Sequence, residues 1–148
     1  MFTIASIAVF AAILTSIALN ISESRLRLIW RLEIVESNSV LDAVGDSGQA
    51  HGPLQFHSVM VAEANRVGGT NYTLQDMENR NKAELAAIAI FRYYDKHIQL
   101  ETGRHATDKE LAFIWNGGGS AWRRVEHPRK DAIQERLEQY WIKVQNAQ

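Results

Sequence analysis

An uncharged apolar run at the start of the chain constrains its fold more than any other feature. Residues 2–21 hold no charged side chain and consist mainly of Ile, Ala, Leu, Val and Phe. A helix of about 20 such residues spans roughly 30 Å, the hydrocarbon thickness of a bilayer. We therefore predict a transmembrane anchor at residues 1–21 and one compact domain at residues 22–148, because this length does not supply two independent cores.

A cleaved secretory signal and a buried core helix are the alternatives for the same run. A signal peptide opens with Lys or Arg and closes with a small-x-small cleavage site. Here no basic residue precedes the run, and residues 18–20 (Ala-Leu-Asn) make a poor cleavage site. The first basic residues are Arg25, Arg27 and Arg31. The positive-inside rule would place the domain that follows them in the cytoplasm, unless these arginines belong to the folded domain.

Charge and cysteine content exclude several classes of partner. The 16 basic and 17 acidic residues give a formal net charge of −1, so no global field attracts a polyanion, and we predict no nucleic-acid partner. The absence of cysteine rules out disulfides and thiolate metal sites. The histidines show no metal-ligand spacing, so we expect no metal and no cofactor. We interpret all five as surface or packing residues: His51, His57, His97, His105 and His127.

Helical periodicity dominates the rest of the chain. Apolar side chains recur at helical spacing in residues 25–36. Further helices are predicted over residues 54–66, 81–102 and 107–115, and after Pro128. Residues 37–53 carry three glycines and a proline, so we expect an ordered loop with at most a short hairpin. The predicted fold class is α+β, predominantly α.

Glu36 is the candidate catalytic acid. It ends the first apolar helix and faces the turn-rich loop, so a rigid element can present its carboxyl group to a groove. Cleavage of a glycosidic bond needs a carboxylic acid that stays protonated near neutral pH, and apolar surroundings favour that state. Taken alone, the same position also fits a solvated glutamate near a helix end.

The motifs around Glu36 resemble those of a known family. A Glu-Ser pair at 36–37 is followed by Ala43, by Gly-Asp-Ser-Gly at 45–48 and by Gly-Pro-Leu-Gln at 52–55. Residues 115–118, late in the domain, read Trp-Asn-Gly-Gly. In this order the motifs resemble those of the lytic transglycosylases (SLT domain) and the goose-type lysozymes. A virion-associated phage member of that group fits the small size and the predicted anchor.

The resemblance implies a lysozyme-like fold and a peptidoglycan-cleaving enzyme that cuts the β-1,4 bond between N-acetylmuramic acid and N-acetylglucosamine. It implies that Glu36 is the acid and then the base, and that Gln55 and Asn116 line the groove. The long central helix of this fold borders the cleft, so Tyr93 and Tyr94 are candidates for stacking on sugar rings. The substrate-binding candidates are Ser37, Gln55, Tyr93, Tyr94, Asn116 and Gly117.

Asp46 decides between two reactions. A second carboxylate that holds a water marks a hydrolase, and the Gly-Asp turn at 45–46 resembles the goose-type turn whose Asp helps to position water. A lytic transglycosylase needs no second carboxylate, because the substrate's own C6 hydroxyl attacks and leaves a 1,6-anhydro end. Goose-type enzymes tend to have a second Asp two residues after the Gln, where this chain has His57.

We predict the transglycosylase reaction, with Glu36 and Asp46 as catalytic candidates and a hydrolytic goose-type lysozyme (muramidase) as the alternative. A turn-capping role for Asp46 stays open. The predicted enzyme is held by the lipid membrane through residues 2–21 and acts on glycan strands, facing the cell wall in the periplasm or lying in the membrane of a phage virion. A non-catalytic glycan-binding virion protein and a membrane-tethered helical adaptor are the alternatives from other classes.

Overall fold

The computed structural model of the protein describes residues 22–126 and 131–148. The predicted anchor at residues 1–21 lies outside this part, and so does His127. No helix in the described part is both long and apolar enough to cross a membrane. The membrane anchor therefore stays a prediction.

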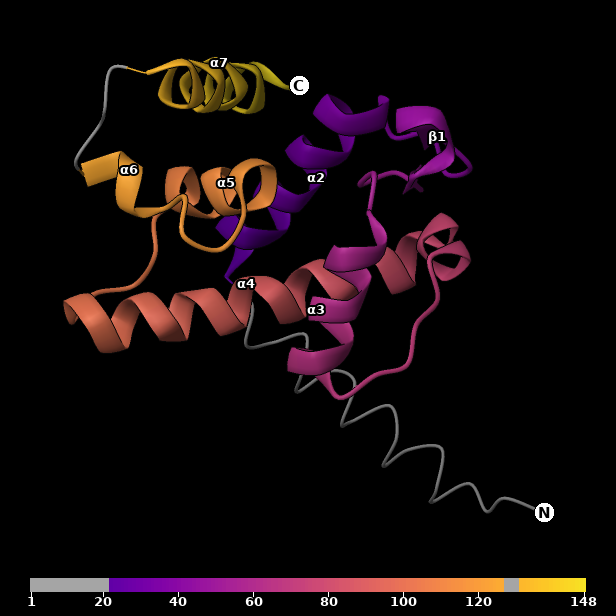
Figure 1. Cartoon of the computed structure of the whole chain (residues 1–148), viewed down its shortest axis with the longest axis horizontal. Coiled ribbons are helices and arrows are strands. Elements are labelled where there is room, and N and C mark those ends of the chain that lie inside the picture. Colours follow the sequence, from indigo (N-terminus) through magenta and orange to yellow (C-terminus); the bar gives the residue numbers. More distant parts are fainter. Residues whose placement is uncertain (1–21, 127–130) are drawn as a thin grey trace.

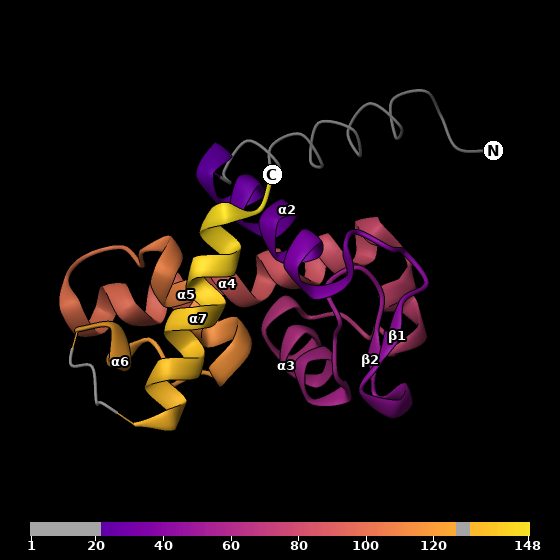
Figure 2. The same ribbon diagram turned by 90° about the horizontal axis from the view of Figure 1, so that it is seen from above.

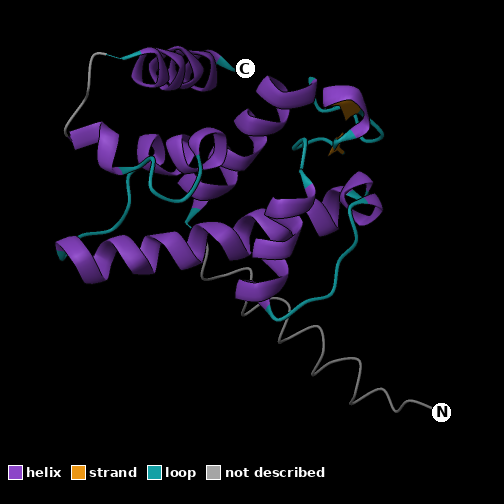
Figure 3. Cartoon of the chain, in the orientation of Figure 1, coloured by secondary structure: helices purple, strands orange, loops and turns teal. Residues whose placement is uncertain are grey.

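Helices form most of the domain, and one small hairpin completes it (Figure 3). The helices are α2 (Glu23–Ser37), α3 (Ser58–Gly68), α4 (Arg80–Thr102), α5 (Asp108–Gly117), α6 (Arg123–Glu126) and α7 (Ala132–Asn146). Two short 3₁₀ helices are η1 (Asp46–Gly48) and η2 (Gln75–Glu78). The antiparallel strands are β1 (Val44–Gly45) and β2 (Ala50–His51). The prediction of a predominantly helical α+β fold is confirmed; the lysozyme-like fold stays a prediction.

The helix α4 organises the domain (Figures 1 and 2). It runs along one side of the molecule, from the end that holds α5 and α6 to the end that holds α3 and the hairpin. In Figure 1, α2 and α5 lie between α4 and α7, and α7 packs on both of them. The domain therefore has two parts joined by α4. One part contains the hairpin and α3, and the other contains α5, α6 and α7.

Local capping explains where two of these helices begin. The Asn79 side chain accepts a hydrogen bond from the backbone N–H of Lys82 and starts α4, which ends at Gly103 in the left-handed conformation. Thr107 and Glu110 form a reciprocal capping box at the start of α5. Both features satisfy backbone groups that a helix end leaves unpaired. Both helices begin within one residue of their predicted ranges: α4 begins at Arg80, one residue before its range, and α5 begins at Asp108, one residue after the start of its range.

A cluster of aromatic rings joins the two ends of the domain. Trp115 of α5 packs edge-on against Phe56, with ring centroids 5.2 Å apart, and against Phe91 of α4, at 5.6 Å. All three side chains are buried, and burial of such large apolar side chains stabilises a fold by about 1.5–3 kcal/mol each. The cluster fixes the end of α5, where the Trp-Asn-Gly-Gly motif lies.

The second helix starts later than predicted. A helix was expected from residue 54, but α3 begins at Ser58. The preceding residues form a tight turn instead, in which His51 and Phe56 exchange backbone hydrogen bonds of 3.0 and 2.9 Å. Gln55 lies inside this turn with a φ of 49°, a value that the residues of a right-handed helix do not adopt. The prediction that Gln55 begins a helix is wrong.

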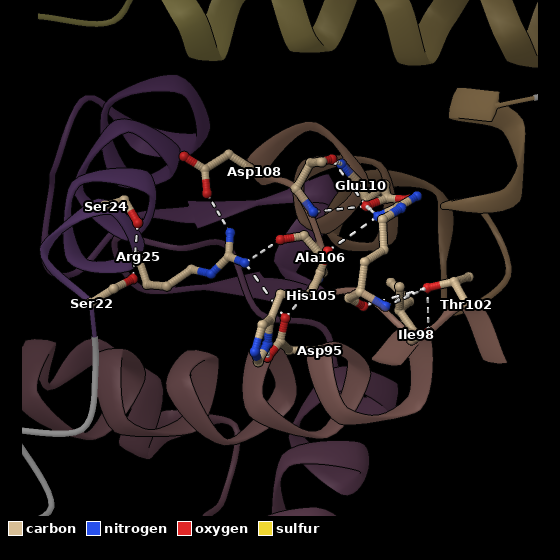
Figure 4. A network of polar contacts seen from close by, with 12 residues as sticks. Ser22, Ser24, Arg25, Asp95, Ile98, Thr102, His105, Ala106, Asp108 and Glu110 are labelled. Carbon is tan, nitrogen blue, oxygen red and sulfur yellow. Dashed lines mark hydrogen bonds and ion pairs between the residues drawn. The ribbon is translucent and has the colours of Figure 1, made fainter. Parts of the chain in front are cut away.

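A polar network ties the start of α2 to α4 and to the loop before α5 (Figure 4). The Arg25 guanidinium donates to Asp108 and to the carbonyl of Ala106, and it lies 3.6 Å from Asp95. Asp95 also accepts the backbone N–H of Ala106 at 2.7 Å and pairs with His105 at 2.8 Å. Arg25 therefore belongs to the folded domain, which is the condition under which it does not report membrane orientation.

Candidate active site

A cleft of about 720 Å³ lies over the middle of α4, lined by residues of α2, α3 and α5 and of the loops beside them. Five of the eight predicted site residues line it: Glu36, Asp46, Gln55, Tyr94 and Asn116. The other lining side chains that bear on its chemistry are His57, Val59, Met60, Glu63 and Trp115. Residues from both halves of the sequence therefore meet at one concave surface, the usual form of a ligand site.

Glu36 is held at the end of α2 by a long-range contact. Its carboxyl Oε1 accepts a hydrogen bond of 2.5 Å from the hydroxyl of Tyr140, which lies on α7. Burial raises the pKa of Glu36 above its ordinary value, while the Tyr140 hydrogen bond and nearby His57 oppose this rise and nearby Asp46 adds to it. The pKa of Tyr140 is also raised, by burial and by the Glu36 charge, so its hydroxyl stays a donor. The site presents to the cleft a carboxyl group whose pKa is raised by burial and whose Oε1 is fixed by Tyr140.

The side chains of Asp46 and His57 are in contact at the cleft. The Nε2 atom of His57 lies 2.9 Å from Oδ2 of Asp46. Asp46 opens η1, and His57 is the residue that precedes α3. The sequence analysis interpreted His57 as a surface or packing residue; its exposed fraction of 35% agrees with a surface position, but it also lines the cleft.

The backbone around the cleft is strained. In the described part of the chain, all five non-glycine residues with positive φ lie between positions 38 and 55. They are Asn38, Ser39, Asp46, Ser47 and Gln55. Left-handed backbone costs about 1–2 kcal/mol for such residues and concentrates at functional sites, where the surrounding structure holds it. Asp46 and Gln55 are both strained and both line the cleft.

Gln55 supports the loop that carries Asp46. Its side-chain Nε2 donates to the carbonyls of Ala43, at 3.2 Å, and Gly52, at 2.9 Å. Its Oε1 fills the space beside Gly45, where an added Cβ would lie only 2.2 Å away. The prediction that Gln55 lines the groove therefore agrees with its position, and its amide group also holds the turn together.

The glycines after Asn116 do not all face the cleft. Gly117 was predicted to bind substrate, but it is not among the lining residues. A Cβ on Gly117 would lie 2.9 Å from both Ala121 and Leu137, so this glycine permits close packing between α5 and α7. Gly118 and Gly119 line the cleft instead.

Ser37 and Tyr93 also lie outside the cleft lining. The Ser37 hydroxyl donates to the carbonyl of Pro53 at 2.8 Å and so fastens the end of α2 to the loop. Tyr93 stacks on His97 and lies under the guanidinium of Arg66, 4.7 Å from its ring centroid. Neither Ser37 nor Tyr93 lies with the five predicted site residues that line the cleft, and their substrate-binding roles stay predictions.

A third carboxylate in the cleft is already paired. Glu63 accepts hydrogen bonds of 2.8 and 2.7 Å from Arg66, and Tyr94 donates to it at 3.4 Å. The Arg66 hydrogen bonds hold the pKa of Glu63 below its ordinary value. Among the three carboxylates that line the cleft, Glu36 is the one that has no Arg, Lys or His nitrogen within ion-pair distance in residues 22–126 and 131–148.

Removal of the Tyr140 hydroxyl should raise the pKa of Glu36 further. The hydrogen bond favours the ionised carboxylate, so its loss in Tyr140→Phe should move the titration midpoint of Glu36 to higher pH. The measurement is NMR titration of the ¹³C-labelled Glu36 carboxyl group in the full chain. The matched control is Tyr93→Phe, which should leave the midpoint in place; a fall of the midpoint in Tyr140→Phe would contradict the assignment.

No group of three or more Asp, Glu or His side chains in the described residues is arranged to hold a metal ion. Comparison with known proteins gave no match, whether to protein-family models, to curated proteins or to solved structures.

Proposed function

We propose that the protein is a peptidoglycan-cleaving enzyme, a lytic transglycosylase that cuts the β-1,4 bond between N-acetylmuramic acid and N-acetylglucosamine. The observation that carries this proposal is Glu36, a partly buried carboxyl group of raised pKa that lines the cleft and accepts the Tyr140 hydrogen bond. Glycosidic bond cleavage needs an acid of this kind, protonated near neutral pH and fixed in direction.

The proposed reaction uses Glu36 twice. Its protonated carboxyl group first donates a proton to the glycosidic oxygen as the bond from that oxygen to the anomeric carbon breaks. The resulting carboxylate then accepts the proton of the C6 hydroxyl, whose oxygen forms the new bond to the anomeric carbon. Tyr140 donates to Oε1 and stabilises this carboxylate between the two steps.

The state of the other cleft carboxylates favours transglycosylation. Hydrolysis in this geometry would need a second carboxylate to hold and activate a water. Asp46 is paired with His57 and Glu63 with Arg66, so Glu36 is the carboxyl group that remains for proton transfer. Hydrolysis is the second candidate, because Asp46 does line the cleft.

The cleft fits a glycan in size and in chemistry. Its volume of about 720 Å³ lies in the range of about 300–1,000 Å³ found for small-molecule sites. Polar groups for sugar hydroxyls come from Gln55 and Asn116, and apolar surface comes from Met60 and from Val59, whose exposed fraction is 73%. With the predicted anchor at residues 2–21, the enzyme would cleave the peptidoglycan that lies close to a membrane, either in the periplasm or from a phage virion.

The test is mass spectrometry of the muropeptides that the full chain releases from purified peptidoglycan. Muropeptides with 1,6-anhydro ends are the expected product. Reducing ends would replace the transglycosylase by a muramidase. If a folded protein released no product, but still bound the glycan, the enzyme proposal would be wrong and a glycan-binding protein would take its place.

A further inference from the structure

The Asp46–His57 pair joins two positions on the cleft that are eleven residues apart in the sequence. Asp46 is held by backbone as well as by this pair, since it adopts a left-handed φ of 47° at the start of η1. His57 is fixed by its place at the N-cap of α3. The two side chains therefore meet where the start of η1 lies beside the start of α3.

Both members of this pair line the same cleft as Glu36. Asp46 and His57 both act electrostatically on Glu36, with opposite signs. A water molecule that attacked the anomeric carbon would need an oxygen of Asp46 as proton acceptor. One of the two oxygens, Oδ2, already lies 2.9 Å from Nε2 of His57, so the imidazole occupies the space next to this oxygen.

We propose that His57 is a positioning residue that prevents Asp46 from activating a water molecule. The products of the enzyme therefore carry 1,6-anhydro ends. The inference rests on the proposed function. With His57 present, the C6 hydroxyl oxygen bonds to the anomeric carbon and its proton goes to Glu36. Without His57, Asp46 is free to take a proton from water, whose oxygen then bonds to the same carbon and leaves a reducing end.

The decisive comparison is between two amides at position 57. The Nε2 atom of a glutamine can reach the place of the imidazole Nε2 and keep the contact with Asp46, whereas the shorter asparagine cannot. We therefore expect His57→Asn and His57→Ala to raise the ratio of reducing to anhydro ends by about tenfold, the size expected for the loss of one polar contact of about 1.4 kcal/mol. His57→Gln should keep the ratio of the unmodified chain.

Two further variants separate this role from a structural one. Asp46→Asn combined with His57→Asn should return the ratio to its original value, because no carboxylate is left to activate water. His105→Ala removes an imidazole that pairs with Asp95 at 2.8 Å outside the cleft, and it should leave the ratio unchanged. A merely structural defect would lower the total amount of product without changing the ratio of its ends.

The readout is the ratio of end types per cleavage event, measured on the full chain. An unchanged ratio in His57→Asn and His57→Ala, with cleavage retained, would overturn the inference alone. Reducing ends from the unmodified chain would overturn both the transglycosylase reaction and the inference. An absence of cleavage by the folded, unmodified chain would instead refute the proposed enzyme, so the failures are distinguishable.

Discussion

Glu36→Gln should lower the rate of glycan cleavage by at least about 100-fold and by up to about 10,000-fold, the range that a positioned general acid contributes. Glutamine keeps the size of the side chain and an oxygen that can accept the Tyr140 hydrogen bond. It has no proton to give to the leaving oxygen and cannot accept one from the C6 hydroxyl. The measurement is the initial rate of muropeptide release from purified peptidoglycan by the full chain.

The matched control lies one turn earlier on the same helix. Glu33 is also buried, and burial raises its pKa too, but it is held by Arg80 at 3.2 Å and does not line the cleft. Glu33→Gln should therefore keep the cleavage rate as long as the protein is folded, which circular dichroism can verify. Full activity in Glu36→Gln, or an equal loss in a folded Glu33→Gln, would show that Glu36 is not the acid.

Helix positions were predictable from the sequence wherever local contacts determine them. The capping box of Thr107 and Glu110 uses hydrogen bonds between neighbours in the chain, so its residue types mark the start of α5 directly. The N-cap of α4 is Asn79, two positions before residue 81, where this helix was predicted to begin. The short hairpin was also expected from the glycines of the loop. These elements need no knowledge of the rest of the fold.

The start of α3 was not predictable in the same way. The residues before it pair with one another across a bridge between His51 and Phe56, and Gly52 lies against the backbone of Met77, which is 25 positions away. Contacts of this range leave no periodic pattern in the sequence. An apolar Leu54 and Phe56 next to a helical segment therefore suggested an earlier helix start than the fold contains.

The sequence identified the cleft residues that belong to motifs, and it missed those that only the folded chain brings together. Glu36, Gln55 and Asn116 belong to recognisable motifs and line the cleft as expected. Tyr140 was missed because it stands 104 positions from Glu36, in a helix whose apolar periodicity already explains an aromatic residue. The sequence did contain an indication that His57 belongs to the site. His57 lies two residues after Gln55, at the position where goose-type lysozymes tend to have a second Asp.

Gly52→Ala should destabilise the fold by about 2–5 kcal/mol. Gly52 adopts a φ of +78°, and a Cβ added there would lie 1.9 Å from the backbone oxygen of Met77. Left-handed strain costs about 1–2 kcal/mol, and displacement of well-packed structure adds about 1–3 kcal/mol. The measurement is equilibrium unfolding of the full chain in urea.

The control for this prediction is a glycine of similar conformation in open space. Gly48 has a φ of +91°, but nothing lies within 4 Å of the position its Cβ would take, so Gly48→Ala should cost only the left-handed strain of about 1–2 kcal/mol. Gly52→Ala should also slow glycan cleavage, because the carbonyl of Gly52 accepts the Gln55 hydrogen bond that holds the cleft loop. Equal losses of stability in the two variants would mean that the contact with Met77 does not constrain this turn.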